Sequence, residues 1–83
     1  MEVYKTIGQM IREKREEKGM TQLELSKQLG YGSSQFVSLF ERGASKIPHE
    51  ALGKVIKILG INKTRVFNLI VNKYKANLEN ELN

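Results

Sequence analysis

Apolar residues recur every three or four positions along the whole chain, and no segment alternates between apolar and polar residues over any length. This spacing is typical of amphipathic α-helices that bury one face, so we expect an all-α fold. Start and stop signals divide the pattern into five helices joined by short turns. Gly19, Gly30 and Gly60 supply stops, because glycine readily adopts the left-handed conformation that ends a helix.

The first two helices each begin at a threonine. Thr6 with Gln9, and Thr21 with Glu24, have the spacing of a capping box, in which the two side chains cap each other's backbone amides. The first helix is therefore expected to start at Thr6. Its buried face would consist of Ile7, Met10 and Ile11. The buried face of the second would consist of Leu25 and Leu29 with help from Leu23, and Met20 would form a hydrophobic staple with Leu25.

The third helix is expected to begin near Ser33, which can cap it, and its two sides differ in character. A helical wheel with about 100° per residue separates the two sides. The packed side consists of Ser33, Val37, Phe40 and Glu41, with Phe36 on its flank. The other side consists of Ser34, Gln35, Ser38, Leu39 and Arg42. This second side is mostly short, able to form hydrogen bonds and edged by a cation.

Two further helices complete the pattern. The fourth is expected to run from about Pro48 to Gly60, and its apolar face consists of Leu52, Val55, Ile56 and Leu59. The fifth would be capped by Asn62 or Thr64, and would occupy about residues 62–83. Its inward face would begin with Val66, Phe67 and Ile70. We expect residues 1–83 to fold as one domain.

The fifth helix is longer than the fold requires. Its apolar stripe continues through Val71, Tyr74 and Leu78, and four other helices offer too little surface to cover it. We expect these three residues to form a symmetric homodimer contact. The alternative is that the stripe folds back on the first helix or frays, since the last residues are polar and terminal.

The second and third helices are separated by only a few residues, Gly30 to Gly32. Two short helices joined in this way form a helix-turn-helix, whose second helix can enter the major groove of B-DNA. Gln35 can pair with adenine through two hydrogen bonds, whereas Leu39 can contact only an apolar group such as the thymine methyl. Arg42 and Lys46 would then lie over flanking phosphates. The simpler alternative is that the third helix is an ordinary amphipathic helix whose polar face meets only solvent.

The charge of the chain agrees with a nucleic-acid partner without requiring one. Fourteen basic side chains against nine glutamates give a net charge of +5, and the excess is spread along the chain. Many inert domains carry a similar excess. The only acid between Ser33 and Lys46 is Glu41, which the wheel places near the packed side.

Residue types argue against catalysis and against a metal site. The chain has no cysteine, no aspartate and one histidine, His49, so it cannot assemble a familiar catalytic triad or a His/Cys zinc site. We expect no enzyme, cofactor, metal or small-molecule ligand. No apolar run approaches the ~20 residues that cross a membrane. The first residues also lack the apolar core of a signal peptide, so we expect a cytoplasmic protein without a membrane partner.

From Ile7 to Phe67 the sequence resembles the phage-repressor (Xre-type, lambda repressor-like) helix-turn-helix family. The matching segments are IREKREEKGMTQ, LSKQLG, SSQFVSLFERG and LGKVIKILGINKTRVF. The resemblance implies a compact five-helix domain in which Gln22 contacts a phosphate and supports the third helix. It also implies an ion pair between Arg15 and Glu41. The groove-facing residues it implies are Ser33, Ser34, Gln35, Ser38 and Leu39.

The resemblance implies a sequence-specific regulator of transcription that binds double-stranded DNA, most simply a repressor that binds a pseudo-palindromic operator as a homodimer. Two departures from the family pattern affect its contacts. Gly32 lengthens the turn relative to many members, and Leu39 stands where relatives often carry a polar residue. The alternative function is a protein-interaction module, such as an antitoxin or an adaptor, that uses the C-terminal helix. RNA binding is less favoured, because few aromatic residues are available to stack unpaired bases.

Overall fold

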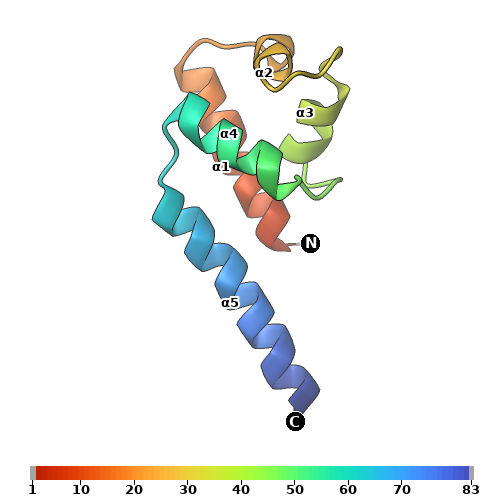
Figure 1. Cartoon of the computed structure of the whole chain (residues 1–83), viewed down its shortest axis with the longest axis vertical. Helices are drawn as coiled ribbons and strands as arrows, with labels where there is room; N and C mark the ends of the chain where they lie inside the picture. Colours follow the sequence, from red (N-terminus) through yellow and green to blue (C-terminus); the bar gives the residue numbers. More distant parts are fainter. Residues whose placement is uncertain (1, 83) are drawn as a thin grey trace.

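A computed structural model describes residues 2–82 of the chain and contains helices and no strands in that range. The helices are α1 (Glu2–Glu17), α2 (Gln22–Gln28), α3 (Gln35–Glu41), α4 (His49–Leu59) and α5 (Lys63–Leu82). Helices α1 to α4 gather into one body, and α5 leaves that body as a long rod (Figure 1). The predicted five-helix, all-α fold is confirmed.

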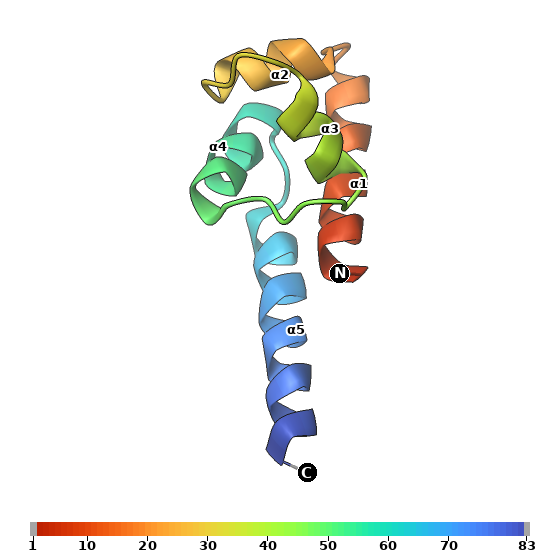
Figure 2. The ribbon, with the colours of Figure 1, turned by 90° about the vertical axis from the view of Figure 1, so that its right-hand side faces the viewer.

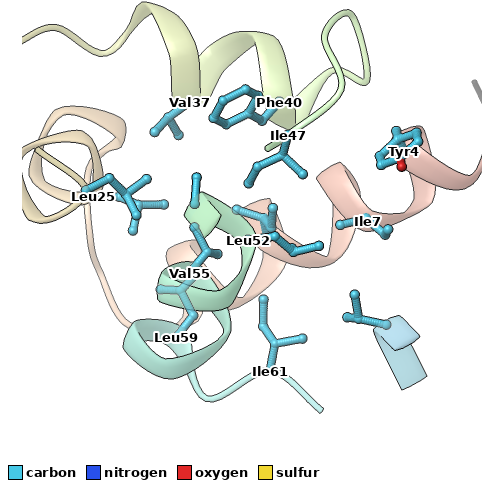
Figure 3. Close-up of a cluster of buried hydrophobic side chains, with 14 residues drawn as sticks. Tyr4, Ile7, Leu25, Val37, Phe40, Ile47, Leu52, Val55, Leu59 and Ile61 are labelled. Atoms are coloured by element: carbon cyan, nitrogen blue, oxygen red, sulfur yellow. The ribbon is translucent and has the colours of Figure 1, made fainter. Parts of the chain in front are cut away.

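The core lies where α1 meets the other helices, since α1 contacts α3, α4 and α5. Side chains from all five helices and from the connecting segments line it (Figure 3). Its most deeply buried large residues are Ile7, Ile11, Leu25, Val37, Val55 and Leu59. The apolar positions of the sequence pattern therefore meet in one cluster, which holds the short helices α2 and α3 in place.

Several predicted helix ends are confirmed. The Thr21 hydroxyl accepts a hydrogen bond from the Glu24 amide, and the Glu24 carboxylate accepts one from the Thr21 amide, each at 3.0 Å. Gly30 and Gly60 end their helices with φ angles of +87° and +69°. At the start of α5, Asn62 Oδ1 accepts a hydrogen bond from the Arg65 amide at 3.0 Å. Asn62, rather than Thr64, is therefore the cap.

The predicted start of α1 at Thr6 is wrong, because the helix already includes Glu2. Thr6 lies inside the helix, and its hydroxyl donates a hydrogen bond to the Glu2 carbonyl at 3.1 Å. The Gln9 amide bonds the Glu13 carboxylate instead of reaching back to Thr6. Tyr4 explains the extra turn. Its side chain is buried in the core, and such packing stabilises a helical turn that local signals alone would not start.

Helix α3 begins at Gln35, slightly later than the sequence indicates. The Ser33 hydroxyl accepts a hydrogen bond from the Gln35 amide at 3.4 Å, while Ser34 occupies the position before the first helical residue and makes no side-chain cap bond. Ser33 is exposed and does not lie on the packed side. It precedes the helix, so the wheel does not describe its direction.

Two apolar residues expected in the core lie outside it. Leu23 is 42% exposed, because it lies on α2 across from Leu25. Phe67 is 63% exposed, since α5 meets the body through the neighbouring face that carries Val66 and Ile70. Both residues carry the helical spacing of a core position, but Leu23 lies about 160° around α2 from Leu25, and Phe67 lies about 100° around α5 from the buried Val66.

The last two turns of α5, beyond the contact of Tyr74 with Lys46, extend away from the other helices (Figure 2). From Lys75 to Leu82 every residue is exposed, and no other helix lies beside this part of the rod (Figure 2). The predicted long C-terminal helix is thus confirmed, and its far end does not fold back on α1. None of the helices within residues 2–82 is long and apolar enough to cross a membrane.

Candidate nucleic-acid interface

Helices α2 and α3 pack against each other and are joined by a short turn. Val37, Phe40 and Glu41 form the buried side of α3. The helix ends before Gly43, whose φ of +69° and close approach to the Lys5 backbone exclude a side chain at this point. These contacts hold α3 against α1 and leave its opposite side facing solvent.

The residues expected to face the groove lie on the solvent side of α3 and on the turn before it. Ser33, Gln35 and Arg42 are exposed, and Ser34, Ser38 and Leu39 are half-buried. The Arg42 side chain turns back along the helix, where its Nε donates a hydrogen bond to the Ser38 carbonyl at 3.3 Å. This side, with the residues that flank the seven-residue helix, combines short polar groups, one apolar side chain and a cation.

Arg15 and Glu41 form a buried ion pair that joins α1 to α3. Arg15 Nε lies 2.6 Å from Glu41 Oε2, and Nη2 lies 3.1 Å from Oε1. The two side chains are only 11% and 2% exposed. The hydrogen bond to Glu41 raises the pKa of Arg15. The one acid between Ser33 and Lys46 is thus turned inward and paired with a cation.

Gln22, the first residue of α2, joins the same network. Its Nε2 donates a hydrogen bond to Glu41 Oε1 at 3.0 Å. Arg15 Nη1 donates another to the Met20 carbonyl, just before α2, at 2.7 Å. Three helices are therefore tied together at one carboxylate, and Gln22 holds the start of α2 against the end of α3. Its half-buried amide group is used in this contact.

Lys46, expected over a phosphate, lies in the connection between α3 and α4 and contacts α5. Its Nζ is 3.4 Å from the Tyr74 hydroxyl and 5.4 Å from the centroid of the Tyr4 ring. Lys73 Nζ lies 5.0 Å from the same centroid. The hydrogen bond to Tyr74 is the main cause that raises the pKa of Lys46. Two cations are thus held over one tyrosine ring beside the end of α3.

Two residues near this surface were not predicted from the sequence. Lys73 carries no motif, and only the packing of α5 on α1 brings it beside Lys46. Phe36 was placed on the packed flank of the wheel, yet it is 48% exposed. Its helical spacing places it on the flank between the two sides of α3, and no local signal in the sequence shows whether another element covers that flank.

Within residues 2–82, no group of three histidine, cysteine, aspartate or glutamate residues could hold a metal ion. His49, at the start of α4, is exposed. Val71, Tyr74 and Leu78, the expected dimer residues, lie on one stripe of α5 and are 40%, 51% and 59% exposed. The stripe continues at its upper end into a shallow apolar groove between α4 and α5, lined by residues that include Ile56, Phe67 and Val71.

The comparisons with known proteins agree with this geometry. The model of a family described as helix-turn-helix matches residues 11–66, which include α2, α3 and α4. Among solved structures, the chain is similar to the clp gene regulator ClgR from Corynebacterium glutamicum, with 25% sequence identity and a TM-score of 0.70. The match covers 96% of this chain and 89% of that one. No curated protein sequence matches the chain.

Proposed function

The chain belongs to the helix-turn-helix family, and on that premise we propose that it is a cytoplasmic repressor that binds a pseudo-palindromic operator as a homodimer. It is a DNA-binding regulator of transcription and not an enzyme. The observation that carries the proposal is the exposed side of α3, a helix whose one acid, Glu41, is buried against Arg15. A helix that presents hydrogen-bonding groups and no free carboxylate can approach the phosphates that line the major groove.

Within the groove, the exposed groups of α3 have distinct tasks. Gln35 pairs with the edge of an adenine, and the small hydroxyl groups of Ser34 and Ser38 allow the helix to approach the bases closely. Ser33 and Leu39 complete the contacts at the start and middle of the helix. Arg42, Lys46 and the start of α2 at Gln22 contact the backbone and set the position of α3 without reading sequence.

The dimer is proposed to form through the exposed stripe of α5. Two copies arranged antiparallel about a two-fold axis near residues 72 and 73 would place Phe67 against Leu78 and Val71 against Tyr74. Such an isologous contact uses the same patch twice, as closed dimers require. Its ends also match in charge, because the basic start of α5 at Lys63 would lie within a turn of Glu81 of the partner subunit.

Repression would then result from the dimer occupying its operator. A single copy reads few base pairs, whereas a dimer reads two half-sites about one helical turn apart. A dimer bound across a promoter occupies the surface that RNA polymerase needs. The same contact can support autoregulation, when the operator lies in the promoter of the chain's own gene.

Selection from a random DNA duplex library near physiological salt tests the proposal. A matched RNA pool serves as the control, and light scattering measures the mass of the same sample. The expected outcome is an enriched inverted repeat in DNA only, together with the mass of a dimer. Enrichment of unpaired RNA, or of no sequence in either pool by a folded protein, would contradict it.

The exposed stripe of α5 also supports a second candidate, a protein-interaction module that binds a partner through this helix. In that case DNA binding is secondary. Replacing Ser34, Gln35 and Ser38 together by alanine separates the two functions. A DNA regulator loses its sequence preference, whereas an interaction module keeps its partner and its cellular effect.

A further inference from the structure

Phe36 presents an apolar ring on the edge of a helix side whose other residues, apart from Leu39, are polar or basic. The side chain is 48% exposed, although its neighbours Val37 and Phe40 are buried. The ring packs on Tyr31, with 4.9 Å between centroids and 34° between planes. Tyr31 in turn contacts Phe40 at 6.3 Å in an edge-on arrangement. The buried Phe40 thus supports the exposed ring of Phe36 through the ring of Tyr31.

Phe36 also lies where a helix in the major groove contacts bases. It is the second residue of α3, and the N-terminal residues of a recognition helix contact base edges. Successive residues are turned by about 100°, so Phe36 lies on the flank next to Gln35, on the side of the turn before α3. Ser38 occupies the opposite flank. The two edges of the recognition side therefore differ, one being apolar and the other polar.

We propose that Phe36, supported by Tyr31, forms a binding subsite for the 5-methyl group of a thymine at the edge of the major groove. The thymine methyl is the distinctive apolar group that base pairs present there, so it is the occupant that matches a phenyl ring. The inference rests on the proposed function and adds a specificity-determining residue to it. Support from Tyr31 reduces the freedom that the ring loses on binding.

The subsite gives the operator an additional requirement. A thymine beside the base read by Gln35 is favoured over cytosine, and its methyl group is buried against the ring on binding. Leu39, the other apolar residue of this side, is half-buried and lies one turn further along the helix. The two residues would contact different positions of the half-site, which allows each to serve as the control for the other.

Uracil substitution provides the test, because it removes the methyl group and leaves the base-pairing edge unchanged. Each thymine of the selected operator is replaced by uracil in both half-sites, and the affinity of the unaltered protein is measured. One position is expected to lose about fourfold per methyl, or about fifteenfold for the pair. Phe36→Ala should bind thymine and uracil operators equally at that position. Leu39→Ala should keep the difference there, and Phe36→Leu should keep part of it.

Circular dichroism of Phe36→Ala controls for folding, and its helical content should match that of the parent protein. A uracil penalty that persists in Phe36→Ala and disappears in Leu39→Ala would overturn the proposal. So would an operator in which no thymine shows a penalty, as expected if Phe36 instead contacts a partner protein. Failure to select any DNA would instead remove the proposed function itself, and the two failures are thus distinguishable.

Discussion

The hydroxyl group of Tyr74 lies 3.4 Å from Nζ of Lys46. The contact joins α5, the helix proposed to mediate dimer formation, to the segment after α3, which is proposed to contact phosphate. Lys46 and Lys73 both lie over Tyr4, so α1 belongs to the same cluster. We therefore expect dimer formation through α5 and DNA binding by α3 to affect each other through these side chains.

Titration of the tyrosines tests this contact. The Lys46 hydrogen bond, and then its charge, lower the pKa of the Tyr74 phenol. A lowered folded-state pKa favours the phenolate, so this contribution to stability is present above the unfolded pKa and is lost as pH falls through the folded one. The pKa of Lys46 is raised. Its own contribution is therefore present below the unfolded pKa and is lost as pH rises through the folded one.

Ultraviolet absorbance should thus show a tyrosine step below the usual value of about 10. Lys46→Met should return that step to its ordinary range, and Tyr74→Phe should abolish it. Lys75→Met, which changes an exposed lysine on the same helix, is the control and should leave the titration unchanged. An unaltered curve in Lys46→Met would show that the hydrogen bond is not formed in solution.

Removing Arg15 should destabilise the protein strongly. Arg15→Met leaves the Glu41 carboxylate buried without its cation, which typically costs about 3–5 kcal/mol. The free energy of unfolding in urea measures the effect. The double variant Arg15→Met with Glu41→Leu should recover most of the loss, since it leaves no buried charge. A double variant as unstable as the single one would mean that packing, rather than charge, explains the loss.

The exposed pair of Arg12 and Glu16, at 2.9 Å, is a matched control on the same helix. Both side chains are more than half exposed, so Arg12→Met should change stability by no more than about 1 kcal/mol.

Gly8 allows α1 to lie against the end of α3. A Cβ atom at this position would come within 2.2 Å of the Phe40 carbonyl oxygen and 2.7 Å of that of Glu41. These are backbone atoms, so Gly8→Ala should displace α3 and cost roughly 1–3 kcal/mol in thermal or urea unfolding. A Cβ atom on Gly53, in α4, would meet no atom within 4 Å other than those of its chain neighbours and its own helix backbone. Gly53→Ala should therefore stabilise the protein by up to about 1 kcal/mol.

Base-reading and phosphate-contacting residues should respond differently to mutation. Gln35→Ala is expected to cost roughly 1–3 kcal/mol and to relax preference at one position of each half-site, whereas Lys46→Ala should weaken all sequences about equally. A dimer that neutralises about five phosphates per protomer has a log–log salt slope near −9. Lys46→Ala should make that slope less steep by about 2. Two variants that both weakened binding without changing base preference would contradict the assigned recognition side.

The proposed dimer makes a separate prediction about mass. Leu78→Asp places a charge in the α5 stripe and should yield a monomer by light scattering at micromolar concentration. Asn80→Asp adds the same charge on the opposite side of the helix and should leave the dimer intact. A dimer in both variants would exclude the stripe as the interface.

The sequence predicted those features that depend on neighbours along the chain. The Thr21 capping box and the glycine helix ends involve residues only a few positions apart, and each was found where expected. The start of α1 could not be predicted in this way, because it depends on Tyr4 packing against distant residues.

In the candidate site, too, the sequence did not predict contacts between residues that are distant along the chain. The solvent side of α3 follows from helical spacing, and only family resemblance pointed to the pairing of Arg15 with Glu41. The contact between Lys46 and Tyr74 joins residues 28 positions apart, and no local pattern indicates it. Phe36 was misjudged because a wheel gives the direction of a side chain without showing what lies beside it.

The extension of α5 beyond the body (Figure 1) has a consequence for the architecture of the operator. If two copies join along this helix, α5 sets the distance between their α3 helices. A helix fixes distance and rotation together, at about 1.5 Å and about 100° per residue. The number of base pairs between half-sites would then depend on the distance along α5 from the body to the two-fold axis near residues 72 and 73, rather than on any residue that contacts DNA. Insertion of a single residue between Ile70, which packs on the body, and the two-fold axis would change the phase of one half-site relative to the other while every contact within a half-site stayed the same.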